Sequence, residues 1–216
     1  MTPLLAQRWD LQLTDLRPGA VSALDVTDIE ACRAAFHDAD AVIHLAADPR
    51  PDAPWDTLLP ANLIGAHHVA QAAVDCGVRR LVLASSLQAL SGYPAGTQLR
   101  TTDPPRPANL YGATKAWAEA LGCWVAATSS TTVVALRIGY FAERPPTGEF
   151  DTPRDLAAWL SPRDCAELLR ASVEADLTGF VVANGVSANR YRQADLRDTM
   201  DRIGYRPSDD AWSPSG

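Results

Sequence analysis

The stretch Arg80-Leu-Val-Leu-Ala-Ser85 decides the fold class, because it is apolar between its two ends and has the length of one β-strand. A second strand-like run, Thr131-Thr-Val-Val-Ala-Leu-Arg-Ile138, follows after an alanine-rich helical pattern at 111–127. Strands that are apolar on both faces and separated by helices are typical of a parallel sheet with helices on both sides. The sequence therefore predicts an α/β protein with a doubly wound, Rossmann-like parallel sheet.

The same alternation of strand and helix patterns continues in both directions. Further strands are expected at 11–15, 21–26, 39–47 and 180–183, and further helices at 28–36, 55–76, 162–174 and 193–203. Capping signals support these bounds, with Ser161 before one helix and Gly77 and Gly204 after two others. The stretch 139–159 is rich in proline and irregular, which is typical of a functional or disordered loop.

Composition excludes several classes of protein. The chain of 216 residues is one domain in size, and its formal net charge of -7 with no basic patch argues against nucleic-acid binding. No run approaches the ~20 apolar residues of a membrane span. The four cysteines are widely spaced without a CxxC pair, so we expect buried thiols in a reducing, cytoplasmic location. No histidines or cysteines stand at metal-ligand spacing, and no metal site is expected.

Lys115 is the one lysine beside 18 arginines. A lysine carries a compact charge whose pKa responds to its surroundings, whereas a guanidinium is planar and stays protonated. Because this sequence uses arginine at every other basic position, the single lysine hints that arginine would not serve at position 115.

The pattern Tyr111-Gly-Ala-Thr-Lys115 opens a helix and places the phenol and the ammonium on one helix face. A cation beside a phenol lowers the pKa of the phenol, so the pair can form a general base. Because any tyrosine and lysine can fall four residues apart by chance, this pattern alone is weak evidence for a catalytic pair. Ser86, at the end of an upstream strand, strengthens it because ligands bind at the carboxyl ends of parallel strands. Asp15 ends the first strand, where an acidic residue would bind an adenosine ribose.

This set of residues resembles the extended short-chain dehydrogenase/reductase superfamily, also called the NAD-dependent epimerase/dehydratase family, and within it the uronate dehydrogenases. The resemblance covers nearly the full chain. The stretches that carry it are Asn62-Leu-Ile-Gly65, Val82-Leu-Ala-Ser-Ser86, Leu110-Tyr-Gly-Ala-Thr-Lys115, Leu136-Arg-Ile-Gly139, Thr152-Pro-Arg-Asp-Leu-Ala-Ala-Trp-Leu-Ser-Pro162, Asn184-Gly-Val-Ser-Ala-Asn189 and Gly204-Tyr-Arg-Pro207.

The resemblance implies an NAD-dependent oxidation of a hydroxyl on a carboxylate-bearing sugar or small hydroxy acid. Tyr111 would take the proton of that hydroxyl, Ser86 would hydrogen-bond the same oxygen, and Lys115 would hold the nicotinamide ribose. The charge of Asp15 would favour NAD over NADP, although Arg17 lies close enough to weaken this preference. The implied cofactor contacts are Asp15, Leu16, Asp25, Val26, Leu45, Ala46, Ala47, Tyr111, Lys115 and Ile138.

The implied substrate contacts are Ser86, Gln88, Tyr140 and Arg154. Arg154 matches the arginine that binds the sugar carboxylate in uronate dehydrogenases, and arginine pairs well with carboxylates. Leu87 and Gln88 stand where those enzymes have Asn and His, and Tyr140 stands where they have Ser. Because a leucine cannot replace the hydrogen bonds of an amide, we expect a smaller or more apolar carboxylate-bearing compound rather than a hexuronic acid.

The N-terminal part departs from the family pattern. A dinucleotide-binding sheet begins with a strand and a glycine-rich turn that holds the pyrophosphate. Here residues 2–8 already resemble the helix after that turn, and no glycine precedes Gly19. We therefore expect an N-terminally truncated sheet, in which the strands of Leu11 and Val42 are separated by an empty slot about twice the ~4.8 Å strand spacing wide.

Three interpretations remain open, and the first is preferred. The first is an NAD-dependent dehydrogenase of the uronate type. The second is a sugar-nucleotide epimerase or dehydratase, for which the segment after Ile138 is short. The third is a cofactor-free remnant that binds a ligand or a partner, which leaves Ser86, Tyr111 and Lys115 without a use. We expect an NAD-binding part at 1–139 and a substrate-binding segment at 140–216. Trp117 and Trp124 lie seven apart on a helix and share a face, which core packing explains. The resemblance also leaves open a homodimer, because related enzymes pair through this helix.

Overall fold

The centre of the protein is a four-stranded parallel sheet. The computed structural model describes residues 2–17, 19, 21–146 and 152–213. The strands follow one another in space in the order β3 (Ala41–His44), β4 (Arg80–Ser86), β5 (Thr132–Ile138) and β8 (Phe180–Gly185). Every neighbouring pair is parallel. The predicted parallel α/β sheet is confirmed.

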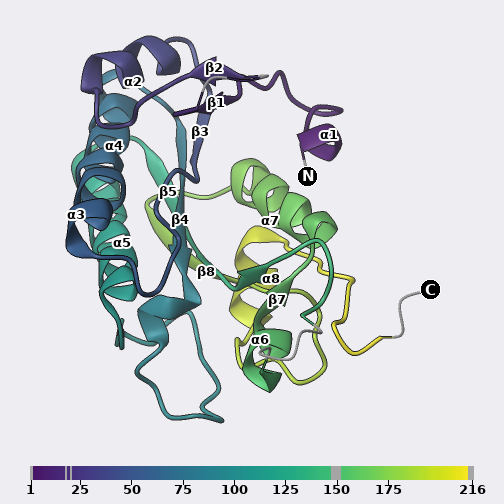
Figure 1. The fold of residues 1–216 in the computed structure, drawn as a ribbon. Coiled ribbons are helices and arrows are strands. Elements are labelled where there is room, and N and C mark those ends of the chain that lie inside the picture. The colour runs from purple at the N-terminus through teal and green to yellow at the C-terminus, as the bar shows by residue number, and fades with distance from the viewer. Residues whose placement is uncertain (1, 18, 20, 147–151, 214–216) are drawn as a thin grey trace.

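Both faces of this sheet are buried because successive side chains of a strand point to opposite sides. In β4, Leu81 and Leu83 belong to one hydrophobic core and Val82 to the other. The helices α2 (Ile29–Phe36), α4 (Ala66–Asp75) and α5 (Leu110–Thr128) cover the first face, and α7 (Pro162–Glu174) and α8 (Arg197–Ile203) cover the second (Figure 1). The doubly wound arrangement is thus also confirmed.

The helix predicted at 55–76 is continuous but not regular. It consists of α3 (Trp55–Leu58), a π-helical segment at Leu59–Gly65 and α4. π-Helical turns inside helices are frequent at functional sites, and this one contains a proline, which cannot donate to the backbone ladder. A Cβ atom on Gly65 would lie 2.5 Å from Val26 Cγ2, so glycine permits the close approach of the chain after β2.

Two regions differ from the sequence prediction. The stretch 139–159 contains a parallel pair, β6 (Tyr140–Phe141) with β7 (Trp159–Leu160), and helix α6 (Pro153–Ala158), so it is not wholly irregular. Helix α8 begins at Arg197 rather than at Gln193. The chain before it runs beside Leu99, whose N–H donates to the Gln193 carbonyl at 2.8 Å and whose carbonyl accepts from Asp195 N at 2.7 Å.

The N-terminal strands form a sheet of their own. Helix α1 (Thr2–Leu5) is followed by β1 (Thr14–Asp15) and β2 (Ser22–Ala23), which are shorter than predicted and pair in parallel with each other. In the described residues this pair is separate from the four-stranded sheet, as the sequence predicts. Beyond residue 139, β8 completes the main sheet, and the division into 1–139 and 140–216 stays a prediction.

Helix length and cysteine burial complete the comparison with the sequence. None of the helices in the described ranges is long and apolar enough to cross a membrane. Cys32 and Cys165 are buried as predicted, and Cys76 is half-buried. The prediction of burial is wrong for Cys123, which lies on the exposed side of α5.

Candidate active site

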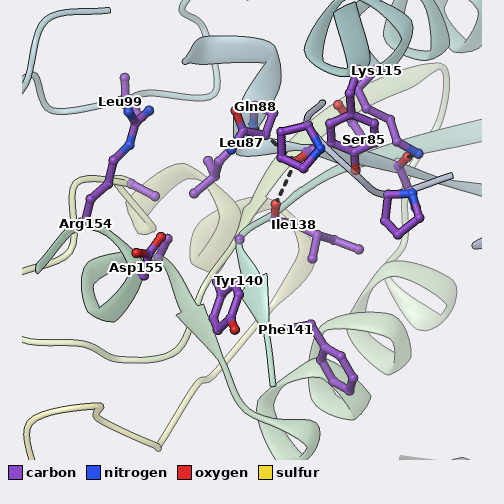
Figure 2. Close-up of a pocket in the computed structure, with 18 of the residues that line it drawn as sticks. Ser85, Leu87, Gln88, Leu99, Lys115, Ile138, Tyr140, Phe141, Arg154 and Asp155 are labelled. Atoms are coloured by element: carbon purple, nitrogen blue, oxygen red, sulfur yellow. Dashed lines mark hydrogen bonds between the residues drawn. The ribbon is translucent and has the colours of Figure 1, made fainter. Parts of the chain in front are cut away.

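A cavity of about 600 Å³ opens at the carboxyl ends of the central strands. This is the position where parallel α/β sheets bind their ligands. Its lining includes the ends of β3, β4 and β5, together with α5, the β6 strand and α6 (Figure 2). Among the lining residues are nine of those predicted from the sequence or its resemblance: Leu45, Ala47, Ser86, Gln88, Tyr111, Lys115, Ile138, Tyr140 and Arg154.

The three predicted catalytic residues lie on one side of this cavity. Tyr111 stands in the first turn of α5 and is 8% exposed, and Lys115 follows one turn later at 7%. The Lys115 ammonium donates to the Ala84 carbonyl at 2.9 Å and lies 5.6 Å from the centre of the Tyr111 ring. Ser86 ends β4, and its hydroxyl donates to the Ile138 carbonyl at 3.4 Å (Figure 2).

Burial controls the charges on this side of the cavity. It raises the pKa of Tyr111; the neighbouring Ser86 hydroxyl opposes this effect and the charge of Asp48 adds to it. The prediction that Lys115 lowers the pKa of Tyr111 stays a prediction; in this arrangement burial is the largest influence on the phenol, and the ammonium donates to the Ala84 carbonyl. Burial also lowers the pKa of Lys115 to about 8. His44 is kept neutral, because burial and the charge of Lys115 lower its pKa to about 3.

Arg154 supplies a cation on a different side of the cavity, away from Ser85 and Lys115 (Figure 2). It stands in the first turn of α6 and is exposed. The carboxylate next to it, Asp155, is already bound by Thr152, whose backbone N–H donates at 2.9 Å and whose hydroxyl donates at 2.7 Å. Within the described residues Arg154 has no ion-pair partner, so its guanidinium is available to an anionic ligand.

The remaining predicted cofactor residues do not line the cavity. Ala46 follows β3 between two lining residues, and Leu16 is exposed after β1. Asp15 ends β1 and accepts from Arg17 N at 2.9 Å. Asp25 accepts from the backbone N–H and the hydroxyl of Thr27, which lowers its pKa. Val26 packs against the π-helical segment. Whether these five bind a cofactor stays a prediction.

A buried amide joins the chain after β3 to helix α5, and its role was missed in the sequence. Asn62 is 4% exposed. Its Oδ1 accepts from Asp48 N at 2.7 Å, and its Nδ2 donates to Asp48 O at 3.0 Å and to Thr114 Oγ1 at 3.1 Å. Thr114 in turn donates to the Tyr111 carbonyl at 2.7 Å. A buried asparagine in an otherwise apolar helix pattern was the available signal.

A buried ion pair fixes the other side of α5. Arg137, near the end of β5, donates from Nε and Nη2 to the two carboxylate oxygens of Glu119, each at 2.8 Å. Ser85 donates to the same carboxylate at 2.7 Å. The other guanidinium N–H groups donate to carbonyls of Arg100, Thr101 and Asp103. The pair therefore ties the helix of Tyr111 to the sheet and to the loop that brings Leu99 to the cavity.

Comparison with known proteins agrees with this geometry. The family model of the NAD dependent epimerase/dehydratase family matches residues 6–149. An NAD-dependent glucose-6-phosphate dehydrogenase from Haloferax volcanii is 37% identical over 203 residues, covering 88% of this chain and 76% of the relative. An L-arabinose 1-dehydrogenase (NAD(P)(+)) from Haloferax volcanii is 38% identical over 207 residues, covering 87% of this chain and 82% of the relative.

A solved structure extends the match to nearly the whole fold. The crystal structure of glucuronic acid dehydrogenase from Chromohalobacter salexigens superposes with a TM-score of 0.88 at 30% sequence identity, covering 98% of this chain and 80% of that one. The resemblance to uronate dehydrogenases is thereby confirmed, and the two sugar dehydrogenases add further relatives. The chain belongs to the NAD-dependent epimerase/dehydratase family.

Proposed function

We propose that this chain is an NAD-dependent dehydrogenase that oxidises a hydroxyl of a carboxylate-bearing sugar or small hydroxy acid. The observation that carries the proposal is the lining of one cavity, which holds Ser86, Tyr111 and Lys115 together with Arg154, a cation without an ion-pair partner among the described residues. Lys115 and Arg154 lie on different sides of this cavity (Figure 2). The names of the relatives support it, since all three are dehydrogenases of a sugar, a sugar phosphate or a sugar acid.

The residues at the strand ends fit a nicotinamide cofactor. Ala47 and Ala84 leave room for a ligand to approach the backbone, and Lys115 provides a buried cation beside them. Asp15 and Asp25 are the candidates to bind the adenosine end. NAD, when bound, supplies the acceptor for the hydride that leaves the substrate carbon.

The side chains of this protein would handle the proton of the same reaction. Tyr111 takes the proton of the substrate hydroxyl while the carbon of that hydroxyl loses a hydride, so that a carbonyl forms and two electrons leave the substrate. Ser86 donates to the reacting oxygen, which would replace its long contact with the Ile138 carbonyl. Lys115 favours the phenolate form of Tyr111 once its charge faces the phenol oxygen.

The other walls of the cavity restrict the substrate. Leu87, Leu99, Tyr140 and Phe141 give it apolar surface. The polar side chains of the lining beyond the proposed catalytic residues are Ser85, Gln88, Arg154, Asp155 and Gln193. Such a wall favours a substrate with few hydroxyl groups to satisfy, because each unpaired polar group costs about 1–3 kcal/mol. We therefore propose a small carboxylate-bearing substrate in place of a hexuronic acid.

We also propose that the protein acts as a homodimer through α5. Trp117 and Trp124 lie seven residues apart on this helix and are 41% and 48% exposed. A second copy of the same helix would cover both rings.

The direct test is NADH formation from NAD with glucuronate, galacturonate, smaller hydroxy acids, glucose 6-phosphate and L-arabinose. We expect turnover, and we expect Tyr111→Phe to lower it about 10²–10⁴-fold because the general base is lost. Tyr191→Phe is the matched control, since Tyr191 is 67% exposed and does not line the cavity. Absence of NADH from protein that circular dichroism shows to be folded would overturn the proposal and favour a cofactor-free binding protein.

A further inference from the structure

The first turn of α5 and the short 3₁₀-helix after β4 meet beside the cavity. Ser86 begins this 3₁₀-helix (Leu87–Leu90), and its hydroxyl accepts from Gln88 N at 3.1 Å. A Cβ atom on Gly112, in the first turn of α5, would lie 2.3 Å from the Gln88 carbonyl oxygen. The two elements are therefore in close contact at Gln88, and the position of this residue relative to α5 is fixed.

Asn109 has one possible orientation at the start of α5. It is the N-cap residue, and its Oδ1 accepts from Gly112 N at 2.7 Å. A backbone N–H can only donate, so the atom that it meets must be the amide oxygen. The Nδ2 group of Asn109 consequently points the other way, where it lies 2.9 Å from the side-chain oxygen of Gln88.

This contact determines the orientation of Gln88 in turn. Because Asn109 donates, Gln88 must accept with Oε1, and its Nε2 group is left for other partners. Gln88 lines the cavity, whereas Asn109 does not. No acceptor for Nε2 of Gln88 is found in the part of the chain that the structure describes. The amide therefore presents N–H donors and not its carbonyl oxygen.

We infer that Gln88 contacts the substrate only as a hydrogen-bond donor, and so selects a substrate oxygen that carries lone pairs but no proton. Asn109 is the positioning residue, because it holds the Gln88 amide with its NH₂ group toward the cavity. The inference rests on the proposed function and names the chemistry of its substrate: a carbonyl, carboxylate or ring oxygen close to the reacting hydroxyl. Two nearby observations agree with it, since the cations in the lining, Lys115 and Arg154, also favour a lone-pair donor.

The substitution Asn109→Asp reverses the polarity without removing the helix cap. Aspartate caps helices as well as asparagine does, so the thermal midpoint should stay the same. An ionised aspartate can only accept, so Gln88 must turn its NH₂ group toward residue 109 and its oxygen toward the cavity. We expect kcat/KM for the carboxylate-bearing probe that the wild type oxidises best in the NADH assay to fall about tenfold, mainly through KM. If this variant is unfolded, Asn109→Ser keeps a cap but loses the amide NH₂ that holds Gln88 Oε1, and it should lower kcat/KM in the same direction.

A double-mutant cycle separates this role from a general effect of the new charge on Tyr111. In a Gln88→Leu background, Asn109→Asp should change kcat/KM less than about twofold, because the residue through which it acts is gone. An equal loss in both backgrounds, or no loss with Gln88 present, would overturn the inference. Wild-type protein without turnover on any probe would contradict the proposed function instead.

Nuclear magnetic resonance tests the orientation without turnover. In protein labelled with ¹⁵N-glutamine, the side-chain signal of Gln88 is the one that Gln88→Leu removes. Asn109→Asp should shift this signal, because the amide protons of Gln88 then donate to a carboxylate. An unchanged Gln88 signal would show that Asn109 does not set its orientation, whatever the activity measurements give.

Discussion

The proposed reaction needs Tyr111 deprotonated and Lys115 protonated, so the two residues set opposite limits on the working pH. Burial raises the pKa of Tyr111, so at neutral pH the phenol is protonated and only a small fraction is the base. Burial lowers the pKa of Lys115 to about 8, so the ammonium persists through neutral pH. We expect kcat/KM for oxidation to rise with pH from about 6 to 8, by up to about tenfold per unit, because deprotonation forms the base. A pH–rate profile that is flat in this range would contradict the role of Tyr111.

Arg154 provides the second prediction at the residue scale. Its guanidinium has no carboxylate partner in the described chain, so a substrate carboxylate would gain a charge-assisted contact. Arg154→Gln should raise KM about tenfold or more for the carboxylate-bearing probe that the wild type oxidises best, and leave KM for L-arabinose, which has no carboxylate, nearly unchanged. Arg202→Gln, an exposed position on α8, is the matched control. Equal losses with both sugars would show that Arg154 serves packing instead.

Among elements, α5 depends most on contacts that no local pattern shows. Glu119 lies in this helix and is bound to the buried Arg137 on β5. Glu119→Gln should reduce the free energy of unfolding by about 3–5 kcal/mol, because it leaves a buried guanidinium without its counter-charge. Glu30→Gln removes a partner of the exposed Arg33 and should cost less than about 1 kcal/mol. Urea unfolding of both variants measures the two losses in the free energy of unfolding. Similar losses would show that the buried Glu119–Arg137 pair does not hold α5 to the sheet.

Elements with a local signal were predicted well, and the others were not. Ser161 with Pro162 marks the start of α7, and Gly204, whose φ is +74°, marks the end of α8. The two-residue strands β6 and β7 are too short for any periodicity, so the sequence could not show them. The start of α8 was placed four residues early, because the chain before it pairs with Leu99, which is distant in sequence.

Some residues of the candidate site could be recognised from the sequence, and others could not. Tyr111 and Lys115 were recognisable because one helix carries both at a spacing that has chemical meaning, and Ser86 because it ends a buried strand. Leu99 and Gln193 also line the cavity, but they come from separate loops that meet only in the folded molecule. Asn109 was visible as a residue before a helix, yet its link to Gln88 depends on two elements in contact.

At the scale of the whole molecule, both faces of the sheet are covered, and the outer side of α5 is left with two large aromatic side chains. Trp117 and Trp124 are 41% and 48% exposed, which is unusual for tryptophan in a helix packed on a core. A stable dimer commonly buries about 800 Å² on each partner, and two such rings at its centre would contribute strongly.

Sedimentation velocity tests this pairing. The wild-type chain should sediment as a dimer, and the double variant Trp117→Lys with Trp124→Lys should sediment as a monomer with an unchanged circular dichroism spectrum, since both rings lie at the surface. Tyr191→Lys is the control, because Tyr191 is more exposed than either tryptophan and lies outside α5. A monomeric wild type would contradict the prediction, and a double variant that stays dimeric would place the interface elsewhere. Because α5 also carries Tyr111 and Lys115, a dimer through this helix would hold the predicted catalytic residues of both copies on shared structure. The Tm of the wild type should then fall on dilution, whereas the Tm of the monomeric variant should not depend on protein concentration.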